Sequence, residues 1–315
     1  MFTSDNQRAS LFMVLSMAAF TMNDTITKYA SESMNVGQVL FVRGVFATLL
    51  IMLLAWRQNA LGNVRSFLHP MVWVRMVGEI GGTVTYLIAL AHLPLPNVAA
   101  IFQALPLAVT MGAALFLGES VGWRRWLAIA IGFCGTLIIV RPGTEGFDAF
   151  SLLVLLCVAF CAVRDLATRR IPHEIPTLFV TAVMATCITL CGLLLMIPMG
   201  GWTPMTPGLA GLLCACACFM LVGFIFIIKA MRTGEVSAVA PFRYSTLLWA
   251  FAMGFLVFGN VPDVYMIVGG AIIVGSGIYT LYRERKVSRR RTAAEAIVSP
   301  TMAPGRAATA DRPIG

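Results

Sequence analysis

Residues 24–28 read Asp24-Thr25-Ile26-Thr27-Lys28, and residues 165–169 read Asp165-Leu166-Ala167-Thr168-Arg169. The two segments begin 141 positions apart, and each lies near the end of an otherwise apolar stretch. Residues 40–48 and 178–186 form a second pair of similar segments at almost the same spacing. The chain therefore contains an internal repeat in which an aspartate and a basic residue recur together.

The composition is that of an integral membrane protein. Apolar residues make up 59% of the 315 residues and charged residues only 12%, which leaves too little polar surface for a soluble domain. The apolar runs are long enough to cross a bilayer as helices, and they lack the strict alternation of barrel strands. We expect ten transmembrane helices, near residues 9–28, 36–56, 71–91, 97–117, 124–140, 148–167, 177–198, 208–230, 236–258 and 264–282.

The repeat divides these helices into two units of five. An odd number of spans forces the second unit to enter the membrane from the opposite side, so the two repeats should be inverted. We predict an all-α integral membrane fold with a first unit at residues 1–145 and a second at 146–285. Residues 286–315 are predicted to be a disordered, basic cytoplasmic tail.

Basic residues predict the orientation. With the N-terminus in the cytoplasm, almost every basic loop residue falls on the cytoplasmic side, and an even number of spans brings the C-terminus there too. The first apolar run has no cleavage site for a signal peptidase and is taken as the first helix. These features fit a multi-pass protein of a bacterial inner membrane. The predicted cytoplasmic loop residues include Arg8, Arg57, Arg65, Arg124, Arg125, Arg169, Arg170, Lys229 and Arg232.

Inversion suggests a role for the repeated aspartates. Asp24 and Lys28 would lie near the outer end of the first helix, and Asp165 and Arg169 near the inner end of the sixth. Each pair is spaced to share a helix face. We interpret the pairs as an outer and an inner gate. The alternative is that they only mark helix ends, with the basic side chain reaching the lipid headgroups.

Several motifs resemble those of the drug/metabolite transporter superfamily, EamA-type branch, over about residues 9–283. They are Asn23-Asp24 with Lys28, the stretch 38–44 from Gln38 to Gly44, Ala104-Leu105-Pro106 with Gly118-Glu119, and the stretch 240–245 with Gly259-Asn260. Asn260 departs from the Gly-Glu pair that this family commonly has at both positions, which puts a symmetric role of Glu119 in doubt. The resemblance implies ten helices in two inverted units, a central substrate cavity and transport without ATP, but it does not give the substrate.

Six of the charged residues in the predicted spans are candidates for positions inside the bundle, and a charged side chain at mid-helix costs about 3 kcal/mol on insertion scales. Three are acids and three are bases, a balance that favours internal pairing or a zwitterionic or polar substrate. Arg43 and Arg164 are assigned to structural ion pairs, although a cavity role was an open alternative for Arg43. The six residues are Asp24, Arg43, Glu79, Arg164, Asp165 and Arg243.

The third span carries a polar stripe. Arg75, Glu79, Thr83 and Tyr86 share one helical face, and Gly78 and Gly82 would let a neighbouring helix approach closely. Glu79 and Tyr86 are predicted to bind substrate. A protonatable Glu79 would couple transport to a proton gradient, unless an arginine pairs with it.

Prolines interrupt the fourth and ninth spans at Pro106 and Pro241. Such breaks free backbone carbonyls and are tolerated where the chain lines a cavity. Gln103, Arg243 and Tyr244 lie beside the two prolines and are predicted to face the substrate.

The eight cysteines all lie in apolar runs, which excludes a disulfide framework and favours packing roles over a metal site. No cofactor is expected. The chain has no Walker A sequence and no motif of a hydrolase, so an ATP-driven pump or a membrane-embedded enzyme is disfavoured. A receptor or scaffold is a further alternative.

We expect a secondary transporter, not an enzyme, that moves a small polar metabolite by alternating access. An amino acid or derivative is the first substrate hypothesis and a flavin-like vitamin the second. The expected partners are a small-molecule substrate and the lipid bilayer. Proton coupling and a homodimer are left open, and nucleic acid is not expected.

Overall fold

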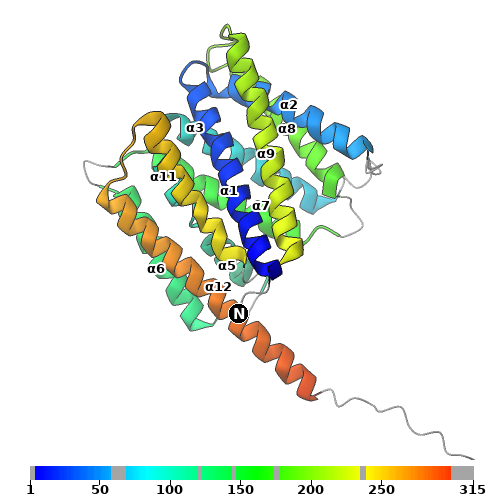
Figure 1. Ribbon diagram of the computed structural model, residues 1–315, viewed down its shortest axis with the longest axis vertical. Coiled ribbons are helices and arrows are strands. Elements are labelled where there is room, and N and C mark those ends of the chain that lie inside the picture. Colours follow the sequence, from blue (N-terminus) through cyan, green and yellow to red (C-terminus); the bar gives the residue numbers. More distant parts are fainter. Residues whose placement is uncertain are drawn as a thin grey trace, which may run out of the picture.

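The computed structural model describes residues 4–57, 69–118, 122–143, 147–172, 177–234 and 239–298. Within these ranges the chain is helical and contains no strand, as expected for an all-α membrane protein (Figure 1). The helices are α1 (Ser4–Ser31), α2 (Val36–Arg57), α3 (Pro70–His92), α4 (Leu95–Phe102), α5 (Leu105–Phe116), α6 (Trp123–Val140), α7 (Phe150–Arg169), α8 (Thr177–Met196), α9 (Pro207–Thr233), the 3₁₀-helix η2 (Ala240–Tyr244), α11 (Ser245–Phe258) and α12 (Val264–Val298).

The ten predicted spans are confirmed. In the described part of the chain, nine segments are long and apolar enough to cross a membrane, and α8 supplies a further, shorter apolar helix. Two of the nine segments combine more than one element, namely α4 with α5 and η2 with α11. Each half therefore has five spans, α1 to α6 in the first and α7 to α12 in the second, and the odd number makes the halves inverted.

The fourth span is broken where its proline requires it. Pro106 has no N–H to donate to the Phe102 carbonyl, so α4 ends at Phe102 and α5 begins at Leu105. Pro106 then lies in the first turn of α5, where a missing donor does no harm. In the ninth span, Pro241 occupies the corresponding early position of η2, and the α-helix resumes at Ser245.

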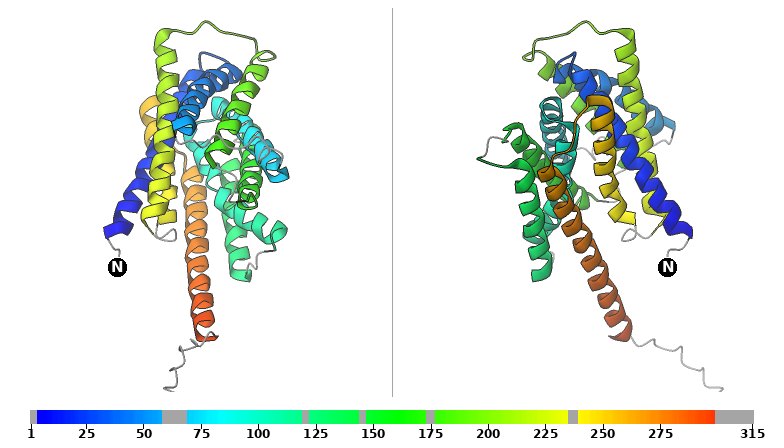
Figure 2. Two further views of the ribbon diagram at one scale, coloured as in Figure 1. Left: turned by 90° about the vertical axis from the view of Figure 1, so that its right-hand side faces the viewer. Right: turned by 60° about the vertical axis from the view of Figure 1, so that its left-hand side comes forward.

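Spans of one half pack mainly against spans of the other. α1 lies along α9, α3 along α7, α2 along α8 and α6 along α12 (Figures 1 and 2). When each helix is replaced by its equivalent in the other half, the α1–α9 pair becomes the α7–α3 pair. The α2–α8 and α6–α12 pairs each join two equivalent helices, so this replacement leaves them unchanged. This packing has the symmetry expected of two inverted repeats.

Glycines show the equivalence of the halves at the level of single residues. A Cβ on Gly82 would lie 2.9 Å from the Cys161 sulfur, and one on Gly223 would lie 2.9 Å from the Phe20 ring. Residues 20 and 161, like residues 82 and 223, are 141 positions apart. The repeat spacing found in the sequence thus relates the α3–α7 contact to the α9–α1 contact.

Two further glycines explain a motif. α5 ends before Gly118 and α11 ends at Gly259, with φ of 69° and 66°, a left-handed conformation that glycine adopts without strain. The backbone needs the glycine of the Gly-Glu motif in both copies. The second residue is free to differ, and it is Asn260 in the second copy; Glu119 lies outside the described residues.

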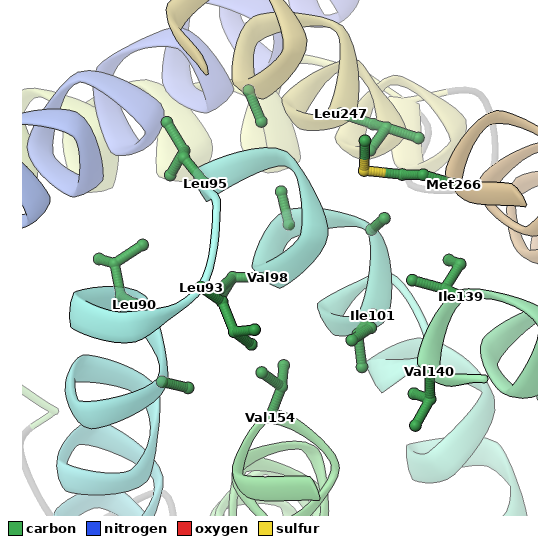
Figure 3. Close-up of a cluster of buried hydrophobic side chains, with 14 of the residues drawn as sticks. Leu90, Leu93, Leu95, Val98, Ile101, Ile139, Val140, Val154, Leu247 and Met266 are labelled. Carbon is green, nitrogen blue, oxygen red and sulfur yellow. The ribbon is translucent and has the colours of Figure 1, made fainter. Parts of the chain in front are cut away.

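The largest hydrophobic core joins the two halves at the end of the bundle where α3 passes into α4. Figure 3 shows Leu90, Leu95 and Ile101 of the first half facing Val154 and Leu247 of the second. These side chains are buried, and they fix the position of the loop between α3 and α4.

The N-terminal end of α1 and the C-terminal part of α12 lie at the same end of the bundle (Figure 2). α12 continues as a helix to Val298, well past residue 285, so the first part of the segment predicted to be a disordered tail is helical in the structure. Residues 299–315 lie outside the described ranges.

Candidate functional site

Asp24 is the centre of a polar cluster between α1 and α3. Its carboxylate accepts a 2.7 Å hydrogen bond from the Tyr86 hydroxyl and a 2.9 Å bond from the Asn23 side-chain amide. The Tyr86 ring packs edge-on against Phe102, with ring centroids 5.5 Å apart. The cluster therefore joins two of the predicted site residues to the end of α4, where the fourth span is broken.

The same segment of α1 contacts the second half of the protein. The buried Cys216 of α9 donates to the Asn23 side-chain oxygen at 3.0 Å, and its sulfur lies 3.3 Å from the Thr27 hydroxyl. Arg43 of α2 donates to the same hydroxyl at 3.4 Å and interacts electrostatically with Asp24. The Asp24 cluster is thus assembled from both halves.

Lys28 does not turn toward Asp24, although the two residues share a helix face. It is 8% exposed, and its ammonium donates to the Leu90 carbonyl at 2.9 Å and to the Leu93 carbonyl at 2.7 Å. The Phe258 ring lies 5.6 Å from the nitrogen. These carbonyls belong to the last turn of α3, where helix carbonyls lack partners and favour a cation. Lys28 therefore ties α1 to the ends of α3 and α11.

A cavity of about 470 Å³ opens above this contact, at the end of the bundle where α1, α3 and α11 terminate. We call this the Lys28 end. The cavity is lined by Lys28, Tyr29, Glu32, His92, Leu93, Pro94, Val257, Phe258 and Asn260. Its walls come from both halves of the protein.

A second charged cluster lies between α3 and α7, toward the other end of the bundle. Arg164 is 3.5 Å from the Glu79 carboxylate and donates to Asp165 at 2.9 Å. Arg75 donates to the Thr168 hydroxyl at 2.7 Å. The polar stripe of α3 is thus divided between two partners, since its first residues contact α7 and Tyr86 contacts α1. Gly78 allows this packing, because a Cβ there would lie 2.8 Å from the Phe160 carbonyl oxygen.

The two clusters occupy equivalent places in the inverted halves. Thr27 contacts Cys216, and Thr168 contacts Arg75. Thr168 lies 141 positions after Thr27, and Cys216 lies 141 positions after Arg75. Asn23 corresponds in the same way to Arg164, and Lys28 to Arg169. The clusters differ in charge, because Arg164 forms an ion pair with Glu79 whereas the equivalent Asn23 is a neutral residue that bonds to Asp24 and Cys216.

Gln103 and Tyr244 are equivalent residues at the two broken spans, again 141 positions apart. Both residues are only 6% exposed, and among the described residues the Gln103 amide nitrogen and the Tyr244 hydroxyl have no hydrogen-bond partner. The Tyr244 hydroxyl packs against Gly277 of α12. Arg243, in contrast, is exposed. Arg169 is likewise exposed, at the end of α7.

Sequence reasoning missed Cys216, Thr27 and the carbonyls of Leu90 and Leu93. Cys216 could have been found, because it lies 141 positions after Arg75 of the polar stripe. Backbone carbonyls carry no signal in the sequence. Among the residues that the structure describes, no group of three or more histidine, cysteine or carboxylate side chains is arranged to hold a metal ion.

The family model of the EamA-like transporter family matches the chain twice, over residues 7–141 and 149–282. Each match covers one of the five-helix halves. A solved crystal structure has a similar fold, with a TM-score of 0.60 at 18% identity over 88% of this chain and 98% of that one.

Three curated relatives are transporters by name. The chain is 25% identical to an S-adenosylmethionine uptake transporter of Rickettsia prowazekii over 281 residues, which are 87% of this chain and 92% of the relative. It is 29% identical to a pseudopaline exporter of Pseudomonas aeruginosa over 272 residues (84% and 92%). It is also 29% identical to a riboflavin transporter of Vibrio cholerae over 290 residues (90% and 96%).

These matches cover most of the chain and both of its halves, and they agree with the ten spans and the inverted packing. The chain is a multi-pass membrane protein that transports a small metabolite, and it belongs to the EamA-like transporter family of the drug/metabolite transporter superfamily.

Proposed function

We propose that the protein is a secondary transporter that moves a small polar organic metabolite by alternating access, with the Asp24 cluster at the substrate path. The supporting observation is the 2.7 Å contact between Tyr86 and Asp24 at a place where both halves of the protein meet. A carboxylate within a span is expensive in the membrane and is typically kept where it serves the solute.

The chemistry of this cluster suits a zwitterion. Asp24 supplies a negative charge for an ammonium group, and Arg43 supplies a positive charge that already acts on the same region. Gln103 and Tyr244 add two buried polar groups that lack hydrogen-bond partners in the part of the chain that the structure describes, and a bound solute would satisfy them. Glu79 has a weaker claim to contact substrate, since it pairs with Arg164. Arg243 is exposed, and we place it at the mouth of the path and not in the cluster.

The two ends of the path would be controlled by equivalent basic residues. Lys28 holds α1 to α3 at one end, with Asp24 beside the path. Arg169 and Asp165 occupy the matching positions of α7 at the other end. We assign Lys28 and Asp24 to the outer gate and Arg169 and Asp165 to the inner gate. Arg43 and Arg164 would stiffen the two clusters.

The proposal includes the setting of the protein. The units are residues 1–145 and 146–285, followed by a basic segment from 286 to 315 on the cytoplasmic side. Both termini face the cytoplasm of a bacterium, and the protein lies in the inner membrane, as the distribution of basic residues predicts.

The first candidate substrate is an amino acid or an amino-acid derivative. The relative from Rickettsia prowazekii is named for the uptake of such a derivative, S-adenosylmethionine. The second candidate is a flavin, because the relative from Vibrio cholerae is named a riboflavin transporter and the Tyr86–Phe102 pair beside Asp24 offers aromatic surface.

Purified protein in proteoliposomes tests this function. Radiolabelled S-adenosylmethionine, L-methionine and riboflavin are offered outside, with protein-free liposomes as the control. We expect saturable entry of S-adenosylmethionine or methionine, recovered chemically unchanged and without added ATP. Entry of riboflavin alone would move the assignment to the second substrate class. Chemical conversion of the solute, or no protein-dependent entry of any of the three, would contradict the proposal.

A further inference from the structure

The cavity at the Lys28 end has a charged floor. Lys28 lines it while remaining 8% exposed, so the ammonium lies at the bottom of the cavity and not on its rim. The volume of about 470 Å³ is within the range of small-molecule sites. The cavity is separate from the Asp24 cluster, because Asp24 and Tyr86 do not line it and Lys28, which does, lies one helical turn from Asp24.

The Lys28 ammonium can donate one further hydrogen bond. It has three N–H donors, and the bonds to Leu90 and Leu93 use two of them. Both partners are neutral carbonyls, and no carboxylate among the described residues forms an ion pair with Lys28. An anionic group entering the cavity would therefore meet a cation whose charge is not neutralised by direct contact.

A negative charge lies at the rim of the same cavity. Glu32 is one helical turn after Lys28, is exposed, and acts electrostatically on Lys28. Phe258 and Asn260 from the second half form the opposite wall. The cavity thus presents one buried cation, one exposed anion and an aromatic surface, an arrangement that complements a dipolar solute better than a solute with several negative charges.

We propose that this cavity is an entry site for zwitterionic amino-acid-type solutes, in which Lys28 binds the solute carboxylate and Glu32 its ammonium group. In the orientation that the basic residues predict, the cavity faces the outside. The proposal rests on the proposed transport function and names its solute class and first binding site.

The same contact links binding to opening. Lys28 holds α1 to the end of α3 through its bonds to the Leu90 and Leu93 carbonyls, and its ammonium lies over the Phe258 ring at the end of α11. A solute carboxylate competes with the two neutral carbonyls for the ammonium, and a charged acceptor forms the stronger hydrogen bond. Arrival of the solute therefore weakens the tie between α1 and α3 and gives access to the Asp24 cluster below.

Equilibrium binding to the detergent-purified full chain tests the site. The probes are S-adenosylmethionine and L-methionine, with decarboxylated S-adenosylmethionine and methionine amide as analogues that lack the carboxylate. We expect Lys28→Gln to weaken binding of the two carboxylate probes by about tenfold and to leave the weak binding of the analogues unchanged. Glu32→Gln changes an exposed side chain, so folding should tolerate it. We expect it to weaken the binding of all four probes severalfold.

Matched controls remove the same charges elsewhere. Lys229→Gln neutralises a lysine of α9 near the opposite end of the bundle, and Asp5→Asn neutralises a carboxylate in the first turn of α1. Both should bind every probe like the wild type. Three results would overturn the entry site. The first is an equal loss of affinity for the carboxylate probes and the analogues in Lys28→Gln. The second is unchanged binding in Glu32→Gln, and the third is no binding of either carboxylate probe to the wild type.

Transport by the same variants separates this inference from the proposed function. If the wild type carries S-adenosylmethionine or methionine but Lys28→Gln and Glu32→Gln keep their preference for carboxylate probes, the entry site is wrong and the transport function stands. If the wild type carries none of the solutes, the proposed function itself fails.

Discussion

The Tyr86 hydroxyl donates a 2.7 Å hydrogen bond to the Asp24 carboxylate and so joins the third span to the first. The bond connects an acidic residue that is expensive in a membrane to a donor on a different helix. Removing only the hydroxyl, with Tyr86→Phe, leaves the ring and its contact with Phe102 in place. We expect the free energy of unfolding to fall by about 1 kcal/mol. We expect the rate of solute uptake to fall by a larger fraction of its wild-type value.

Uptake in proteoliposomes and thermal unfolding of the purified variant measure the two effects. Tyr282→Phe, at an exposed position of α12, is the matched control and should change neither. Uptake by Tyr86→Phe at the wild-type rate would mean that the Tyr86–Asp24 contact serves only packing.

The Lys28 contact predicts how the Lys28 end of the bundle responds to substitution. Cys216 is fully buried beside Asn23 and Thr27, beneath the end of the bundle that Lys28 ties together. Lys28→Gln removes the charged tie to Leu90 and Leu93, so we expect a membrane-impermeant maleimide to modify Cys216 several times faster. Mass spectrometry of the Cys216 peptide gives the rate, and Lys229→Gln is the control. Equal rates in both variants would exclude Lys28 as a gate.

Close packing between α3 and α7 depends on Gly78. A Cβ at this position would lie 2.8 Å from the Phe160 carbonyl oxygen and 2.9 Å from the Arg164 backbone nitrogen, and neither backbone atom can turn away. Gly78→Ala should therefore destabilise the protein by about 1–3 kcal/mol. Gly211→Ala is the control, since no atom lies within 4 Å of its added methyl group. Thermal unfolding measures both, and an equal melting temperature for the two variants would contradict the observed helix packing.

The Glu79–Arg164 pair gives a test of a different kind. The two side chains are about one-quarter exposed and lie 3.5 Å apart, between the extremes of a surface and a buried ion pair. Glu79→Gln or Arg164→Gln alone should cost about 1–2 kcal/mol, because the first removes one of the two carboxylates that contact Arg164 and the second leaves Glu79 without its arginine. The double variant should cost less than the sum of the single ones. Strict additivity in thermal unfolding would show that the two residues do not interact.

The pair also changes the reading of Glu79. The sequence predicts that Glu79 could carry a proton unless an arginine pairs with it. Arg164 is that arginine, which argues against this role. Within the described ranges, Asp24 has no comparable ion pair with an arginine. Any proton coupling of transport is therefore better sought at Asp24 than at Glu79.

Much of the fold was predictable because the governing signals are local. Apolar runs predict the spans, the spacing of 141 residues predicts the repeat, and the odd number of spans in each unit predicts the inversion. Pro106 and Pro241 predict the two broken helices. The partners of the charged residues were not predictable in this way. Asp24 and Lys28 share a face of α1, yet one bonds to Tyr86 and the other to the end of α3.

Those partners depend on how helices from distant parts of the chain pack. Lys28 bonds to backbone carbonyls, which every residue has, so no side-chain pattern could reveal the contact. Depth in a span predicts a cavity role or an ion pair for Arg243, and the structure shows an exposed side chain in η2. The repeat offers a better guide, because it relates Gln103 to Tyr244 and Thr27 to Thr168.

Solute flux through Asp24→Asn tests the central claim most directly. The variant keeps the size of the side chain, removes its charge, and replaces one of the two accepting carboxylate oxygens by an NH2 group. Asp5→Asn makes the same change at the other end of the same helix. With equal amounts of correctly folded protein in the proteoliposomes, the wild type and Asp5→Asn should take up the solute while Asp24→Asn should lose at least nine-tenths of the rate, about 1.4 kcal/mol or more. Wild-type flux through Asp24→Asn would show that the solute path does not run past this carboxylate.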